Sequence, residues 1–445
     1  MIQPQNPLLL KEHLTQADLR DGWQVLSAGD RALSLKLIPR GEAEDFFASL
    51  YAQDQAEVLD ALPPDERRSW LRLLPPDDAA DVIQETAAEN REAVMALLDP
   101  PTHAEVIALL AYEEDEAGGL MNPRYARVRP HMTVDEAISY LRKQAHDYPE
   151  TIYYVYVLDE QQHLLGVVSF RELFAAPPGK AVREVMSTDV VCVTEQEDQE
   201  SLSRLFAQLD LVAIPVVDAQ RRMKGIVTVD DIVDVVQEEA TQDMQKIGGM
   251  AALDAPYLKV GFLEMIRKRA GWLSALFLGE MLTATAMGYF EGEISRAVVL
   301  ALFIPLIISS GGNSGSQATT LVIRSMALME VRLRDWWRVM RREIGVGVAL
   351  GSILGTIGFL RIVVAQAIMP LYGPYYLLVA ATIFLSLVGV VTFGTLAGSL
   401  LPFLLRRLGL DPASASAPFV ATLVDVSGLV IYFSVASLVL RGTLL

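Results

Sequence analysis

ALFIPLIISSGGNSGSQATTLVI (Ala301–Ile323) is an apolar run with a polar centre, and the way it is accommodated determines the architecture of the chain. Gly311, Gly312 and Asn313 suit a lipid-facing helix poorly, because glycine loosens a helix and an unpaired amide is costly in hydrocarbon. The chain either leaves the membrane here or turns this polar segment toward protein or water. Pro305 has no backbone N–H, so we expect it to leave the carbonyl of Ala301 without its helical partner.

The surrounding sequence favours the second possibility. Five segments are long and apolar enough to span about 30 Å of hydrocarbon: Ala270–Phe290, Ile294–Ile323, Ile344–Met369, Tyr375–Leu405 and Ala413–Leu440. The connections after the second and fourth segments are basic, whereas the other two contain no Lys or Arg. The positive-inside rule then predicts a multi-pass inner-membrane protein with a cytoplasmic N-terminal half and the C-terminus outside. A loop at Ser309 would invert all later basic loops, so the polar segment is expected to stay at membrane depth.

Charge divides the chain into two halves. The 445 residues carry a formal charge of −18, but from Lys259 onward 15 Lys and Arg face 9 Asp and Glu, which leaves −24 for residues 1–258. An acidic soluble half of this kind argues against nucleic acid and anionic lipid as its partners and favours metal cations.

Two acidic residues lie near the centres of predicted spans, Glu280 and Asp425. Ionisable groups at that depth are costly and indicate function unless they only hydrogen-bond a neighbouring helix. Asp425 shares one helical face with Ala421 and Ala417, and Pro418 is expected to free a further carbonyl near Ser414. A carboxylate beside exposed carbonyl oxygens suits a hard cation such as Mg²⁺ or Ca²⁺. The role of Glu280 stays open at this point.

Residues 121–240 contain an internal repeat. Each copy predicts a strand, an amphipathic helix, a second strand, a third strand from Gly166 or Gly225, and a final helix. The pattern resembles a tandem pair of CBS domains, which implies an adenine nucleotide such as ATP bound through a Gly-x-x-Ser/Thr-x-x-Asp stretch. Gly225, Thr228 and Asp231 match this stretch, whereas the first copy carries Glu172 in place of the aspartate.

Short acidic helices flank the repeat. The N-terminal region carries LPPDE (Leu62–Glu66) and LPPDD (Leu74–Asp78), in which proline followed by acids marks a helix start. A helical solenoid-like unit is predicted there. After the repeat, Asp231, Asp234, Glu238 and Glu239 crowd one predicted helix, with Asp243 a turn further on. Like charges at this spacing destabilise a bare helix, and a bridging divalent cation would relieve the repulsion.

Taken together, the chain resembles the MgtE family of magnesium channels and transporters over nearly its whole length. The most specific segments are PLIISSGGNSGSQ (Pro305–Gln317), DPASASAPFVATLVDVSG (Asp411–Gly428) and EEATQDMQKIGG (Glu238–Gly249). The resemblance implies a homodimeric Mg²⁺ channel in the lipid bilayer, without enzymatic activity, whose pore closes when cytosolic Mg²⁺ binds between the soluble domains. Gln242 stands where the family often has an acid, so one such site is expected to be weaker.

The resemblance also implies residue roles. The ion site in the pore would be Asp425 with the carbonyls of Ala421 and Ala417, and the pore wall would include Pro305, Gly311, Gly312, Asn313, Gln317 and Pro418. The cytosolic regulatory ligands would be Asp45, Asp77, Asp81, Glu200, Ala207 (carbonyl), Asp210, Asp231, Asp234, Glu239 and Asp243.

The expected architecture is a multidomain membrane protein. It comprises an acidic helical N domain (1–120), an α+β CBS pair (121–180 and 181–236), a connecting helix (237–269) and an all-α transmembrane domain with five spans (270–445). Two other functions remain open: a carrier for Co²⁺, Mn²⁺ or Ca²⁺, and a membrane-anchored nucleotide sensor without transport.

Overall fold

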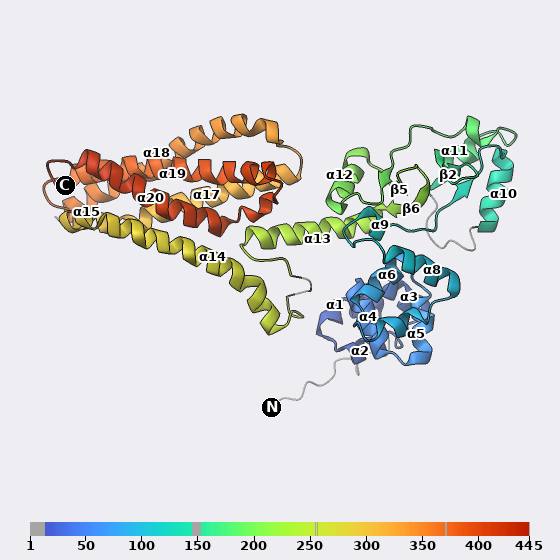
Figure 1. Cartoon of the computed structure of the whole chain (residues 1–445). Helices are drawn as coiled ribbons and strands as arrows, with labels where there is room; N and C mark the ends of the chain where they lie inside the picture. Colours follow the sequence, from blue (N-terminus) through green and yellow to red (C-terminus); the bar gives the residue numbers. More distant parts are fainter. Residues whose placement is uncertain (1–13, 145–152, 254, 256, 370–371, 445) are drawn as a thin grey trace, which may run out of the picture. The chain divides into compact units, whose positions relative to one another are not determined.

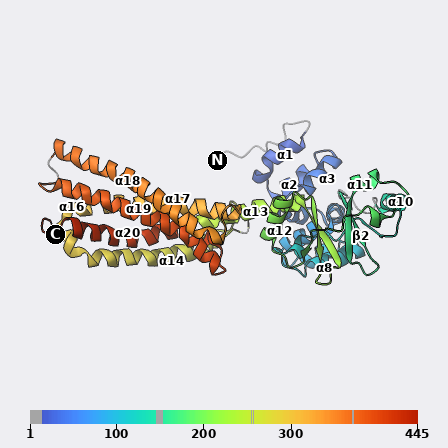
Figure 2. The ribbon, with the colours of Figure 1, turned by 90° about the horizontal axis from the view of Figure 1, so that it is seen from above.

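The computed structural model describes residues 14–144, 153–253, 255, 257–369 and 372–444. The chain forms two compact units, Met1–Gln237 and Glu238–Leu445, drawn in two views in Figures 1 and 2. Residues 1–13 of the expected N domain and residues 370–371 of an expected loop lie outside the described part.

The first unit begins with a bundle of short helices. Prolines occupy the first turn of the helices at residues 64, 76 and 100, which confirms the helix starts predicted from LPPDE and LPPDD. Phe46 and Phe47 are fully buried in the shared core. The helical elements are α1 (Gln16–Gly22), η2 (Trp23–Val25), α2 (Ala28–Ser34), α3 (Arg40–Ala48), α4 (Ala52–Ala61), α5 (Pro64–Leu71), α6 (Pro76–Glu85), α7 (Arg91–Met95), α8 (Pro100–Leu109) and α9 (Ala117–Leu120).

The predicted repeat folds as two equivalent three-stranded sheets, in the orders β1-β2-β3 and β4-β5-β6, with one parallel and one antiparallel pairing in each. The first copy contains β1 (Arg127–Val128), α10 (Val134–Gln144), β2 (Tyr154–Leu158), β3 (Leu164–Ser169) and α11 (Phe170–Ala175). After η3 (Val182–Glu184), the second contains β4 (Val193–Thr194), α12 (Gln199–Leu209), β5 (Ala213–Val217), β6 (Met223–Thr228) and α13 (Val229–Ile247).

The two copies are joined by backbone hydrogen bonds. Strands β3 and β6 were predicted to start at Gly166 and Gly225, but each begins two residues earlier. At these earlier positions the N–H groups of Leu164 and Met223 donate to backbone carbonyls of the opposite copy. At Gly166 a Cβ atom would lie 2.7 Å from the Ser187 carbonyl oxygen, and at Gly225 it would lie 2.7 Å from that of Asn122. Both glycines are therefore required by the close approach of another backbone segment.

Within its described residues, the second unit contains five helices that are long and apolar enough to cross a membrane, as predicted. Helix α19 packs against α17, α18 and α20, while α14 packs against α20, and Figures 1 and 2 show these helices side by side. Their bounds are α14 (Phe262–Tyr289), α17 (Ile304–Ala327), α18 (Trp336–Ile368), α19 (Tyr376–Arg407) and α20 (Ala417–Val439), with α15 (Glu291–Arg296), α16 (Val298–Ala301), η4 (Leu333–Asp335) and η5 (Pro412–Ser414) between them.

The polar segment of the opening stretch is helical throughout and has two faces. Gly311 and Gly315 are buried in α17, where a Cβ on Gly311 would lie 2.5 Å from Val390 Cγ1 on α19. The packing is reciprocal, since a Cβ on Gly398 of α19 would lie 2.1 Å from the Gly315 carbonyl oxygen. Thr319 Oγ1 donates to the Gly398 carbonyl at 3.0 Å. Small residues thus allow α17 and α19 to approach with their backbones almost in contact.

Three expectations about helix geometry were wrong. The expected span Ile294–Ile323 is interrupted between α15, α16 and α17, and its last helix continues to Ala327. Pro305 lies in the first turn of α17, so it frees no carbonyl inside a helix. Pro418 likewise lies in the first turn of α20, whose N-cap is Ser416, and Ser414 precedes that helix. In both cases proline starts a helix instead of kinking one.

Candidate metal centres

Asp425 and Glu280 meet between two spans. Asp425 on α20 is partly buried, and its carboxyl group forms a side-chain hydrogen bond with that of Glu280 on α14. The helices approach closely one residue earlier, where a Cβ on Gly279 would lie 2.7 Å from Thr422 Cγ2. Sequence analysis identified both acids at membrane depth but did not pair them.

Ala421 and Ala417 lie one and two turns before Asp425 on α20, next to the polar segment of α17. A Cβ on Gly312 would lie 3.5 Å from Ala421 Cβ, so these two small residues face each other. Ser316 Oγ donates to the Ala417 carbonyl at 3.2 Å. The Ala417 carbonyl therefore already has a side-chain partner on α17.

An exposed polar stripe runs along α17 beside these residues. Ser309, Asn313 and Gln317 recur every four residues, and all three are exposed in the single chain. Asn313 Nδ2 donates to Ser309 Oγ at 3.4 Å. Of the other residues expected at the pore wall, Gly311 is buried against α19 and α20, while Pro305 is exposed and Pro418 is partly buried at the helix ends.

An acidic cluster in the first unit has the composition of a divalent-cation site. Asp77 and Asp78 of α6 and Asp231 of α13 each place a carboxylate oxygen within 4.8 Å of the others. Asp77 is only 7% exposed. Carboxylate oxygens alone suit a hard cation such as Mg²⁺. Asp78 was not among the expected ligands, although it belongs to the LPPDD segment that marked the helix start.

Burial and crowding raise the pKa values of three carboxyl groups in and beside this cluster. Burial, followed by repulsion from Asp230 and Asp234, raises the pKa of Asp78 to about 6. Burial also raises the pKa of Asp231 to about 7, although Thr228 donates a hydrogen bond that opposes this change. At Asp81, burial and then repulsion from Asp78 and Asp231 raise the pKa to about 8. Asp81 is nevertheless exposed to solvent at the edge of the cluster, which leaves a path for an entering ion.

The remaining expected regulatory ligands do not join this cluster in the described part of the chain. Asp45 is exposed on α3, and Asp234 is exposed on α13 one turn after Asp231. On α12, Glu200 forms an ion pair with Arg204 at 2.6 Å, Ala207 is exposed, and Asp210 caps the helix with a φ of 51°. Glu239 and Asp243 lie further along α13, near enough to Lys246 for their negative charges to help raise its pKa.

The C-terminal end of α13 is held against the membrane spans of the second unit. Lys246 Nζ lies 2.7 Å from Asp411 Oδ2, just before α20. Gly249 has a φ of +75°, and a Cβ there would lie 2.8 Å from Trp272 and 3.2 Å from Pro418. Trp272 Nε1 in turn donates to Ser416 Oγ at 3.1 Å. The GG pair that ends the acidic helix is thus fitted to the start of α20.

The expected nucleotide residues have structural roles. Gly225 is required by the approach of Asn122, and Thr228 Oγ1 donates to Asp231 Oδ2 at 2.7 Å at the start of α13. Ser169 and Glu172 form the equivalent capping box in the first copy. Asp231 also belongs to the acidic cluster. Nucleotide binding therefore stays a prediction from the motif.

Comparison with known families defines the class of protein. A family model described as a divalent cation transporter matches residues 304–435. A model for the MgtE intracellular N domain matches residues 14–115. A model for the CBS domain matches twice, at residues 117–179 and 182–238. The chain is thus a membrane transport protein of the divalent-cation class.

Individual relatives identify the family. The chain is 45% identical over 331 residues to a magnesium transporter MgtE of Thermus thermophilus, covering 74% of this chain and 71% of that protein. MgtE of Enterococcus faecalis is 35% identical over 74% of this chain and 70% of its own length. The chain belongs to the MgtE family. A solved cytosolic domain of the Mg²⁺ channel MgtE in complex with ATP is 45% identical and covers 50% of this chain and 91% of its own, with a TM-score of 0.47.

Proposed function

We propose that this protein conducts Mg²⁺ across the inner membrane through a pathway beside Asp425. The observation that carries the proposal is the exposed polar stripe of Ser309, Asn313 and Gln317 next to the α20 face with Ala421. Polar side chains at membrane depth must face protein or water, and Asp425 adds the negative charge that a cation requires. The ion would pass largely hydrated, since Mg²⁺ loses its water reluctantly.

A second copy of the chain would complete this pathway. In one chain the polar stripe is open to its surroundings, and hydrocarbon there would leave its amide and hydroxyl groups unpaired. A homodimer with its axis along this face would turn both stripes and both Asp425 residues toward a shared water-filled path. The basic connections after α17 and α19 support an orientation with the soluble half in the cytoplasm and the C-terminus outside.

Glu280 is proposed as the residue that positions Asp425. Its carboxyl group comes from a different span and forms a hydrogen bond with the Asp425 carboxyl group. A fixed carboxylate binds a hydrated ion with less loss of conformational freedom than a mobile one. This assigns Glu280 to the transport pathway without making it a direct ligand.

Regulation by cytosolic Mg²⁺ is proposed at the cluster of Asp77, Asp78 and Asp231, with Asp81 at its edge. The cation would replace protons among crowded carboxyl groups and hold α6 against the start of α13. Helix α13 runs without interruption from Asp231 to the residues that contact the spans, so the cation would bias the helix that closes the pathway. Glu239 and Asp243 are proposed as further ligands along the same helix.

Ion flux into proteoliposomes tests the function. Proteoliposomes loaded with a Mg²⁺ indicator should show uptake that falls as internal Mg²⁺ is raised. Preference for Co²⁺, Mn²⁺ or Ca²⁺ would favour a carrier for another cation. Absence of any flux, with ATP binding retained, would favour a sensor. We propose transport without a catalytic step, so uptake should need no nucleotide hydrolysis.

A further inference from the structure

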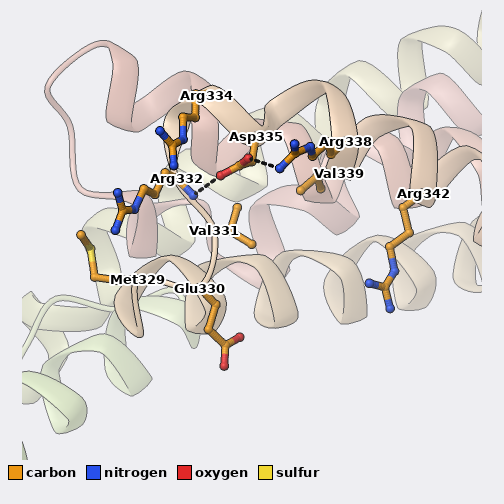
Figure 3. Close-up of a pocket in the computed structure, with 9 residues that line it drawn as sticks. All are labelled: Met329, Glu330, Val331, Arg332, Arg334, Asp335, Arg338, Val339 and Arg342. Carbon is orange, nitrogen blue, oxygen red and sulfur yellow. Dashed lines mark hydrogen bonds and ion pairs between the residues drawn. The ribbon is translucent and has the colours of Figure 1, made fainter. Parts of the chain in front are cut away.

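A basic pocket lies between the ends of two membrane spans, outside the pathway described above. It has a volume of about 470 Å³ and lies between the C-terminus of α17 and the N-terminus of α18. Four arginines and two acids contribute to its lining, together with apolar residues: Met329, Glu330, Val331, Arg332, Arg334, Asp335, Arg338, Val339 and Arg342. Figure 3 shows these side chains, with Glu330 directed away from Arg334 and Arg338.

The acids do not neutralise the pocket. Asp335 Oδ2 accepts the backbone N–H of Arg332 at 3.2 Å, and Asp335 Oδ1 lies 3.2 Å from Arg338 Nη1. Among the described residues, no carboxylate forms an ion pair with Arg334 or Arg342. The side chain of Asp335 makes no capping hydrogen bond to α18. The guanidinium group of Arg332 likewise has no carboxylate ion pair among the described residues. Three guanidinium groups and the positive end of a 33-residue helix therefore remain available to an anion.

A strained turn shapes this pocket. Met329, two residues after the end of α17, has a φ of 57°, a left-handed conformation that costs a residue with a side chain about 1 kcal/mol. The turn is closed by the Val331 N–H, which donates to the Ser325 carbonyl at 3.1 Å. This six-residue closure reverses the chain tightly after α17 and places Arg332 and Arg334 directly before the start of α18.

The surroundings indicate a lipid and not a soluble ligand. The pocket lies where α17 and α18 end, so it is at a membrane surface whichever way the protein is oriented. Trp336 and Trp337 beside it are 47% and 56% exposed, with ring centroids 5.6 Å apart. Tryptophan concentrates at the headgroup level because its ring is apolar and its N–H is polar. Leu328 is 55% exposed next to the turn and would face acyl chains.

We propose that this arginine pocket binds the phosphate of an anionic phospholipid headgroup. The planar guanidinium groups of Arg334 and Arg342 can each present two N–H donors to phosphate oxygens, which a lysine cannot do. The tryptophans and Leu328 would contact the glycerol and upper acyl chains of the same lipid. Binding at this position would hold the connection between α17 and α18 at a fixed depth in the membrane.

The experiment compares two double variants of the full-length protein in detergent. Arg334→Gln/Arg342→Gln removes two of the three unpaired guanidinium groups. Arg341→Gln/Arg407→Gln is a matched control, because it removes the same charge from exposed positions outside the pocket. Binding of phosphatidylglycerol is measured by native mass spectrometry, with phosphatidylcholine as the zwitterionic comparison.

The pocket variant should bind phosphatidylglycerol about 25-fold more weakly, since each arginine near an anionic surface contributes a factor of about five. The control should bind within about twofold of wild type, and phosphatidylcholine should bind weakly to all three. An equal loss of phosphatidylglycerol binding in both variants would overturn the proposal and would indicate general attraction between the basic protein surface and the anionic lipid. Displacement of the lipid by millimolar inorganic phosphate would overturn it in favour of a soluble anion. Unchanged elution in size-exclusion chromatography excludes misfolding as the cause.

Discussion

Lys246, one residue before the end of α13, forms an ion pair with Asp411 at the start of the segment that leads into α20. The two residues are 165 positions apart in sequence. The pair connects the acidic helix to the span that carries Asp425, and Ile247 adds an apolar contact with the cluster of Ile323, Ala413 and Ala415. Any movement of α13 away from the spans must break these contacts.

Breaking this ion pair should favour the conducting state. The side chains are 31% and 37% exposed, so the pair contributes less than about 1 kcal/mol. Lys246→Gln should therefore raise residual Mg²⁺ flux at high internal Mg²⁺ by up to about fivefold. The charge reversal Lys246→Asp/Asp411→Lys should restore inhibition. If the reversed pair is as poorly inhibited as the single variant, the contact has no part in closure.

Asp425 should be essential for Mg²⁺ conduction. Asp425→Ala should abolish Mg²⁺ flux with the fold retained, because the pathway loses its charge. Asp425→Asn keeps the shape, so it should lose preference for Mg²⁺ over monovalent ions. Flux in proteoliposomes and the size-exclusion profile measure these outcomes. Wild-type selectivity in both variants would remove Asp425 from the ion site.

The proposed positioning role of Glu280 predicts a difference between two substitutions. In Glu280→Gln the amide N–H can still donate to the Asp425 carboxylate, so Mg²⁺ flux should remain within about threefold of wild type. Glu280→Leu removes the hydrogen bond and should reduce flux about tenfold or more. Equal loss in the two variants would indicate that the charge of Glu280, and not its hydrogen bond, is required.

Mg²⁺ binding at the acidic cluster should depend on pH. The pKa values of Asp78, Asp231 and Asp81 are raised from 3.8 to about 6, 7 and 8. Because the pKa values in the folded state lie above the unfolded value, protonation of these groups stabilises the metal-free fold at low pH. This stabilisation is lost as the pH rises through 6 to 8. Mg²⁺ must displace these protons. The Mg²⁺ concentration that gives half-maximal protection should therefore rise about tenfold for each proton displaced and for each unit by which the pH falls.

Protease cleavage within Glu238–Gly249 measures this dependence. Wild type should be protected by Mg²⁺ at a lower concentration at pH 8 than at pH 6. The triple variant Asp78→Asn/Asp81→Asn/Asp231→Asn should be cleaved equally with and without Mg²⁺ at both pH values. Mg²⁺ protection of wild type at the same concentration at pH 6 and pH 8 would show that these carboxyl groups do not bind the ion.

The glycine contacts between α17 and α19 predict a stability difference. A Cβ on Gly398 would lie 2.1 Å from the Gly315 carbonyl oxygen, so Gly398→Ala should destabilise the membrane unit by about 1–3 kcal/mol. Gly271→Ala on α14 is the control, because nothing lies within 4 Å of its Cβ position. Thermal unfolding in detergent should separate the two variants. Similar melting temperatures would mean that α17 and α19 are less closely packed than described.

The sequence was sufficient for features set by local chemistry. Hydropathy located the five spans, and proline followed by acids located the starts of α5 and α6. Prolines at residues 305 and 418 were misinterpreted because an apolar run gives no sign of where one helix stops and the next begins. Proline is found both at helix starts and at helix kinks, and only the conformation of the neighbouring backbone shows which of the two it forms.

The candidate sites were predicted only in part, for a different reason. Asp77 and Asp231 were expected ligands, but their proximity to Asp78 depends on how α6 packs against α13. The pairing of Glu280 with Asp425 could have been inferred from two acids at membrane depth in one chain. The arginine pocket had no such signal, because it depends on a left-handed turn at Met329, a residue with no preference for that conformation.

The junction between the helical domain and the second CBS copy determines where this part of the chain can bend. Ala117 and Gly118 donate backbone hydrogen bonds to Glu197 and Glu195, and Asn122 exchanges two with Ile226 of β6. The stretch from residue 117 to 122 is therefore part of the strand framework and cannot act as a tether. A pivot for the helical domain must lie earlier, between the end of α8 at Leu109 and α9. Swinging motions of that domain would then leave the strand entering α13 undisturbed. They would reach the helix through the loss of contact at Asp77 and Asp78 and of the hydrogen bond that Gln237 donates to Tyr51.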